Sequence, residues 1–131
     1  MIRLLFFSFI SIVFLGCEDF PVYEEFKTPK KTFECLSLDV NDTKLLNVLK
    51  KEINFNPEDK CKYSLRGYIH ESTKCTSLYA KTHGEDFNGY VYLEIKQNKD
   101  RLYRVQSDFK DDLNGSISRV VTKVNTIVRE E

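Results

Sequence analysis

The side chains whose spacing most restricts the chemistry of this 131-residue chain are its four cysteines, Cys17, Cys35, Cys61 and Cys75. Cys17 differs from the others because a basic start at Arg3 and an apolar stretch, residues 4–15, come before it. A basic start followed by a short apolar run is the layout of a secretory signal peptide. A membrane-spanning helix needs about 20 apolar residues, more than this stretch contains. We therefore expect the segment to direct export and then to be removed.

The apolar stretch ends in Phe14-Leu15-Gly16-Cys17. These residues resemble the lipobox of bacterial lipoproteins, in which a small residue precedes the cysteine that becomes lipidated. Gly16 and Cys17 fit the family pattern. Phe14 and Leu15 depart from it, because the family usually has Leu and then a small residue at these places. A plain signal peptide would need small residues at the −3 and −1 positions, which this run lacks, and a buried core helix would not begin at Arg3.

The resemblance implies that residues 1–16 are a cleaved lipoprotein signal peptide and that Cys17 becomes a diacylated (palmitate-type) N-terminus. Stable anchoring generally takes more than one acyl chain, and diacylation meets that requirement. The protein would then be held by membrane lipid on the periplasmic side of a bacterial membrane. In enteric bacteria Asp directly after the lipidated cysteine favours the inner membrane. Here Glu18 takes that place and Asp19 follows, so the outer membrane is the weakly preferred location.

The stretch after Cys17 has two prolines, many charges and no steady apolar period. We interpret residues 17–31 as the lipidated cysteine and a tether. The alternative is that this segment docks on the domain or on a partner through its apolar residues, Phe20, Val22, Tyr23 and Phe26. The remaining residues, 32–131, are enough for one domain and not for two.

Apolar periodicity predicts the elements of that domain. Alternation with a period of two indicates strands over residues 32–40 and 61–70, and a hairpin over residues 90–109. Residues 76–81 are ambiguous and are interpreted as a short strand. Helical spacing indicates one helix that is capped by Asn41 or Asp42 and has an apolar stripe of Leu45, Leu46, Leu49 and Ile53.

Helical spacing recurs from Leu113 to Val128, a segment rich in β-branched residues. Together these patterns predict an α+β fold. We expect a small antiparallel sheet of four to five strands, with two helices packed on one face.

An exported chain can form disulfides, and lipidation of Cys17 leaves three cysteines, enough for one bond and one further thiol. Cys61–Cys75 is the favoured pair because both residues flank the strand predicted at residues 61–70. Cys35 would then be buried in the first strand, which is common for a free cysteine. The pairings Cys35–Cys61 and Cys35–Cys75 stay open.

Two stretches contain an Asn-x-Ser/Thr triplet with an acidic residue two places before the Asn: Asp39-Val40-Asn41-Asp42-Thr43 and Asp112-Leu113-Asn114-Gly115-Ser116. They resemble the extended acceptor sequence of the bacterial oligosaccharyltransferase. The resemblance implies that Asn41 and Asn114 carry glycan in the periplasm. Both triplets fall at predicted loop-to-helix junctions, where Asp, Asn, Ser and Thr are also common as helix caps. Capping is therefore the competing interpretation.

The chain has 20 Lys and Arg against 20 Asp and Glu, a formal net charge of +0. This balance gives no electrostatic reason to expect nucleic acid or a strongly anionic surface as partner. His70 and His83 lack the spacing of zinc or calcium ligands. The chain also lacks a nucleophile elbow and a phosphate-cradling glycine loop. We expect no enzyme activity, no metal and no cofactor.

Tyrosines of the predicted hairpin are weak candidates for binding protein or glycan, namely Tyr90, Tyr92 and Tyr103. Cross-strand aromatic pairs also simply stabilise sheets, and that interpretation is preferred. The leading expectation is a non-enzymatic periplasmic lipoprotein that binds or scaffolds another component of the cell envelope, such as an envelope protein. The alternative is a small ligand- or lipid-binding module, which would need an apolar cavity between sheet and helices. An enzyme of unknown class ranks third.

Overall fold

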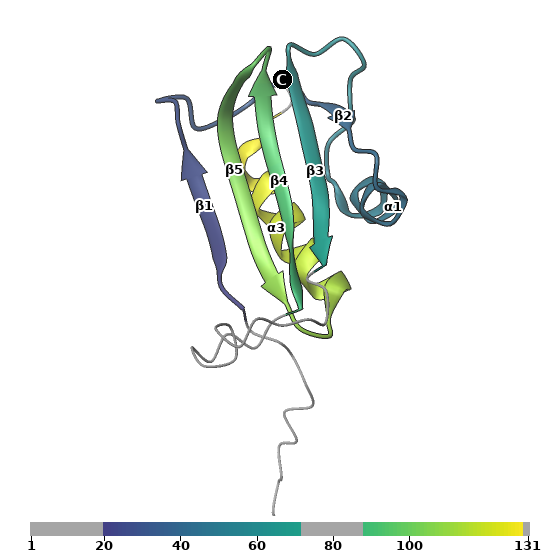
Figure 1. Cartoon of the computed structure of the whole chain (residues 1–131). Helices are drawn as coiled ribbons and strands as arrows, with labels where there is room; N and C mark the ends of the chain where they lie inside the picture. The colour runs from purple at the N-terminus through teal and green to yellow at the C-terminus, as the bar shows by residue number, and fades with distance from the viewer. Residues whose placement is uncertain (1–19, 72–87, 130–131) are drawn as a thin grey trace, which may run out of the picture.

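One five-stranded sheet and two helices make up the part of the chain that the computed structural model describes, residues 20–71 and 88–129 (Figure 1). The strands lie in the spatial order β1-β5-β4-β3-β2. Their bounds are β1 Val22–Phe26, β2 Ser37–Asp39, β3 Tyr63–Glu71, β4 Gly89–Gln97 and β5 Asp100–Phe109. The helices are α1 Thr43–Glu52 and α3 Leu113–Ile127. The predicted α+β class is confirmed.

The sheet is mixed, because β2 pairs with β3 in parallel while the other neighbouring strands are antiparallel. Parallel neighbours need a crossover connection, and α1 is that crossover. The long strand predicted at residues 32–40 is only three residues in the structure. Phe33, in the same stretch, forms an isolated bridge to Val128 instead.

The tether prediction requires a correction for residues 22–26, which form β1. This strand pairs with β5 in a register that places Val22 opposite Ser107 and Phe26 opposite Tyr103. Charged side chains at Glu24 and Glu25 hide the apolar alternation that usually marks a strand. Such charges are typical of an edge strand, where they discourage pairing with other chains. The sheet therefore begins within the segment interpreted as a tether, before residue 32.

One face of the sheet is buried beneath both helices, as predicted. Side chains of β4 alternate, and Val91, Leu93 and Ile95 on the inner face are each 0 % exposed. Figure 1 shows α3 behind the sheet, and this helix packs on β4 and β5 while α1 packs on β3 and on α3. At Gly67 on β3 a Cβ atom would lie only 2.7 Å from the Tyr92 carbonyl oxygen and 3.3 Å from Leu45 of α1. Only glycine allows this close approach.

Each helix begins at an aspartate that caps it. The Leu45 N–H donates to Asp42 Oδ1 (2.9 Å) at the start of α1, and the Gly115 N–H donates to Asp112 Oδ1 (2.9 Å) at the start of α3. In α3 the β-branched residues form its buried stripe, so tertiary burial outweighs their modest helix propensity. In the described part of the chain, neither helix is long and apolar enough to span a membrane.

The disulfide differs from the favoured prediction: Cys61 bonds to Cys35, with Cα atoms 5.9 Å apart. Cys61–Cys75 was wrong for a topological reason. The register of the parallel pair sets Ser37 opposite Ser64, which brings the residues just before β2 and β3 together. Cys75 lies outside the described residues, as do residues 76–81.

Peptide mapping under non-reducing conditions should therefore recover a peptide that contains Cys35 linked to one that contains Cys61. The Cys35→Ala/Cys61→Ala variant should lose about 3 to 4 kcal/mol of unfolding free energy in a urea titration, because the bond closes a loop of 26 residues. Recovery of Cys61 bonded to Cys75 would contradict this pairing.

Candidate functional site

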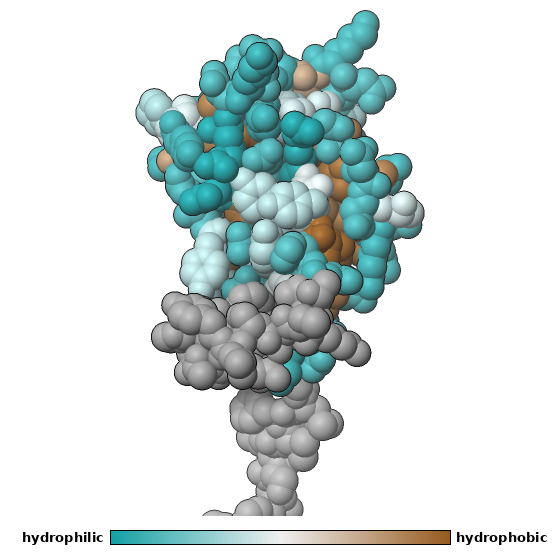
Figure 2. Space-filling view, in the orientation of Figure 1, coloured by the Kyte–Doolittle hydropathy of each residue, from teal (hydrophilic) through white to brown (hydrophobic). Residues whose placement is uncertain are grey.

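The face of the sheet opposite the helices carries an aromatic cluster, which we define as Tyr68 and His70 of β3 with Tyr90 and Tyr92 of β4. The Tyr68 ring lies 5.1 Å from the Tyr92 ring and 6.1 Å from the Tyr90 ring, centroid to centroid. His70 stacks on Tyr90 at 4.9 Å. These side chains come together because the register sets Tyr68 opposite Tyr92 and His70 opposite Tyr90. Figure 2, which views this open face, shows pale aromatic rings grouped near its centre.

Tyr68 has 47 % of its surface accessible, whereas Tyr92 is 8 % exposed. The Tyr92 hydroxyl donates to Glu94 Oε2 (2.9 Å) and accepts from Arg101 Nη1 (3.2 Å). These two hydrogen bonds fix the position of the Tyr92 hydroxyl. Tyr68 is left as the projecting ring, with Tyr92 as its support.

The pKa values of the Tyr68 and Tyr92 phenols are both raised, so these two groups stay neutral at physiological pH. A hydrogen bond with Tyr90, and then burial, raise the pKa of Tyr68 to about 12. Burial, and then the hydrogen bond to Glu94, raise the pKa of Tyr92. Neutral phenols offer hydrogen bonds and apolar ring faces, which are the properties of a contact surface.

A shallow hollow of about 250 Å³ lies beside Tyr68. Its polar wall includes the salt bridge between Arg66 Nε and Asp39 Oδ2, at 3.3 Å. Both side chains of this pair are about half exposed, so the pair contributes little to stability. The remaining lining residues are Asn41, Gly67, Tyr92 and Glu94.

Tyr103 is not part of this surface, and its prediction as a binding residue was wrong. The register pairs Tyr103 with Ile95, which places the phenol on the inner face, where it is 0 % exposed. Its hydroxyl donates to Glu24 Oε2 (2.7 Å), and its ring lies 4.7 Å from that of Phe26. Burial and the Glu24 hydrogen bond raise its pKa. Tyr103 is a core residue.

Tyr68 was not among the candidate binding residues predicted from the sequence, although the alternation along β3 indicates that it faces outward. It shares the outward phase of Ser64, Arg66 and His70 along β3. Gly67 interrupts the inward apolar alternation next to it and so weakened that signal. Among the residues that the structure describes, no three His, Cys, Asp or Glu side chains gather in a way that would hold a metal ion. His83 and Cys17 lie outside the described residues.

The two candidate acceptors for glycan have different settings. Asn41 is exposed just before α1 and also lines the hollow beside Tyr68. Asn114 is exposed but lies within the first turn of α3. The acidic residues of both sequons have structural partners: Asp39 pairs with Arg66, and Asp112 caps α3. These partners account for the two acidic residues without invoking a glycan.

No family model, no curated protein and no solved structure matches this chain.

The capping role of Asp112 can be separated from a role of the sequon in glycan attachment. Asp112→Ala should lower the unfolding free energy by about 1 kcal/mol, the usual cost of losing an N-cap. Asn114→Gln should change it by no more than about 0.5 kcal/mol, because the residue is exposed. Urea titrations of unglycosylated protein measure both values. Equal stability of wild type and Asp112→Ala would contradict the capping role.

Proposed function

We propose that this chain is a lipid-anchored, non-enzymatic lipoprotein that binds another protein of the bacterial cell envelope through the open face of its sheet. The observation that carries the proposal is the aromatic cluster. Its projecting ring, Tyr68, is nearly half exposed on a face that neither helix covers. Tyrosine is enriched among the residues that dominate binding energy at protein interfaces.

The anchor rests on the resemblance at Gly16-Cys17, and the fold gives it a geometric consequence. Cys17 precedes the first strand residue, Val22, by five residues, a reach of at most about 18 Å when extended. The Ser107 hydroxyl donates to the Pro21 carbonyl (3.4 Å), which fixes the chain just before β1. An acylated Cys17 would thus hold the domain close to the bilayer.

The strands then determine how the open face is presented. β1 and β3 begin at opposite ends of the sheet, and the end that holds Val22 also holds Gly89 and Phe109. This end would lie nearest the membrane, and the strands would lead away from it. The aromatic cluster on the open face would accordingly be presented sideways, toward a neighbour in the same compartment.

Packing between sheet and helices favours a surface contact over carriage of a ligand inside the fold. The residues that fill this space, among them Leu45, Leu65 and Val120, are 0 % exposed. The hollow beside Tyr68 has about 250 Å³, below the roughly 300–1,000 Å³ of typical small-molecule sites. Its size fits a side chain from a partner.

A photoreactive amino acid at position 68 should crosslink the native protein to a discrete partner. The same amino acid at Thr122, exposed on α3, serves as the matched control and should not give that adduct. With the partner in hand, Tyr68→Ala should weaken binding by about 30-fold, the loss typical of a hot-spot residue. The same adduct from position 122, or unchanged affinity of Tyr68→Ala, would contradict the open face as the binding surface.

Replacement of Cys17 tests the anchor independently of the partner. Cys17→Ser should abolish incorporation of labelled palmitate and move the protein from the membrane fraction to the soluble fraction, because it removes the sulfur that carries the acyl chains. Cys35→Ala/Cys61→Ala is the control and should keep the label. Membrane association of Cys17→Ser equal to that of wild type would refute lipid anchoring.

A further inference from the structure

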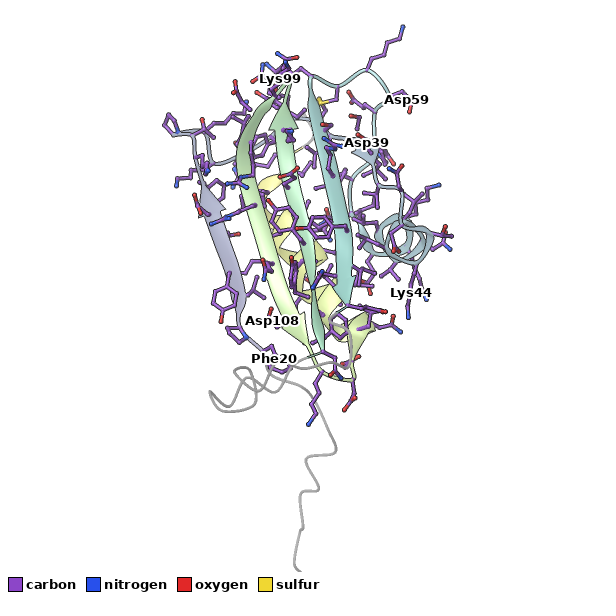
Figure 3. All side chains as sticks on the ribbon, viewed as in Figure 1. Phe20, Asp39, Lys44, Asp59, Lys99 and Asp108 are labelled. Atoms are coloured by element: carbon purple, nitrogen blue, oxygen red, sulfur yellow. A yellow bond between two sulfur atoms is a disulfide. The ribbon has the colours of Figure 1, made fainter. Side chains whose placement is uncertain are left out.

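The zero net charge of the chain conceals a basic hollow at one end of the sheet. We define the turn-end hollow as the depression of about 540 Å³ between the chain after β1 and the turn that joins β4 to β5. Three cations, Lys27, Lys99 and Arg101, line it together with a single carboxylate, Asp100. Figure 3 shows Lys99 at this end of the molecule and Phe20 and Asp108 at the other.

The lysines of the hollow are not neutralised within the described protein. Neither Lys27 nor Lys99 forms a salt bridge with any residue in the described ranges, and neither does Asp100. Glu34 is not available to the lysines of the hollow, because it binds both Lys30 (2.8 Å) and Lys62 (3.5 Å). The pKa of Glu34 is lowered to about 2, chiefly by the hydrogen bond from Lys30. This carboxylate is committed to those two lysines.

Arg101 adds an oriented guanidinium to this end. Its Nη1 donates to the Tyr92 hydroxyl at 3.2 Å, which fixes the side chain on the open face. Its Nε is buried and has no hydrogen-bond partner in the described part of the protein. A buried donor without a partner is costly, so this guanidinium has hydrogen-bonding capacity that the described part of the protein does not use.

We propose that the turn-end hollow binds a phosphate ester. Two lysines and one arginine around a single carboxylate suit a ligand of about two negative charges, which a phosphate monoester carries and a single carboxylate does not. A guanidinium held in place and two mobile ammonium groups match the several acceptor oxygens of phosphate. The volume leaves room for an organic group beyond the phosphate itself. The proposal does not depend on lipidation, and it shares only the Arg101–Tyr92 hydrogen bond with the aromatic cluster.

The position of the hollow in the fold restricts which molecules could supply the phosphate. β5 runs ten residues, about 30 Å, from the hollow to the end that holds Val22. In an anchored protein the hollow would therefore face away from the anchoring bilayer. A soluble phosphate ester or a lipid headgroup of an opposing surface satisfies the same chemistry, and the two can be distinguished by experiment.

The test is a titration of the full mature protein, in detergent, with glycerol phosphate followed by amide chemical shifts. Shifts should concentrate at Lys27, Lys99 and Arg101. Lys27→Gln/Lys99→Gln should weaken the apparent affinity at least about tenfold, since each lost charge-assisted bond is among the stronger hydrogen bonds. Lys50→Gln/Lys51→Gln on α1 removes the same charge from an exposed site and should bind as wild type does.

A second arm uses vesicles of phosphatidylcholine with and without phosphatidic acid, whose headgroup is a phosphate monoester. Binding of glycerol phosphate without vesicles identifies the ligand as a soluble ester. Binding only to the anionic vesicles identifies it as a lipid headgroup. Either result supports a phosphate site if the Lys27→Gln/Lys99→Gln variant no longer binds that probe. Failure of both probes, or equal weakening in the α1 variant, overturns the proposal. Crosslinking from position 68 is unaffected by either result, so the two hypotheses fail separately.

Discussion

Burial of a single face of the sheet is the constraint on which the rest of this structure depends. Inward residues of β3, β4 and β5 must pack against α1 and α3, so the outward residues of the same strands are fixed on the open face. The close approach of α1 at Gly67 extends this constraint to β3. Because a strand alternates with a period of two, a shift of one residue would exchange the faces of Tyr68 and Gly67. The aromatic cluster is thus a consequence of core packing.

The elements with strong internal periodicity were predictable from the sequence. Val91, Leu93 and Ile95 define β4, and the helical spacing after Leu113 defines α3 despite its β-branched residues. A cap at Asn41 or Asp42 was predicted for α1, and the structure shows that Asp42 is the capping residue. In each case the residues that specify the element lie within the element itself.

Features that depend on contacts between distant segments were not predictable in the same way. β1 is specified by pairing with β5, some 80 residues later, and its own glutamates obscure it. The Cys35–Cys61 bond follows from the parallel register of β2 and β3, which has no local signature. Tyr103 was misassigned because its face depends on the register shift between Ile95 and Lys96. The basic hollow could not be predicted from the formal net charge, because the acidic and basic residues of the whole chain cancel in that sum.

Arg101 connects the two surfaces, because it lines the turn-end hollow and hydrogen-bonds to Tyr92 of the aromatic cluster.

We propose above all that a partner covers the open face of the sheet in the cell. Hydroxyl-radical footprinting of tyrosines, in purified protein and in intact cells, measures this most directly. Tyr68 should be modified in the purified protein and protected in cells, while buried Tyr103 resists modification in both. Equal modification of Tyr68 in the two samples would contradict the claim.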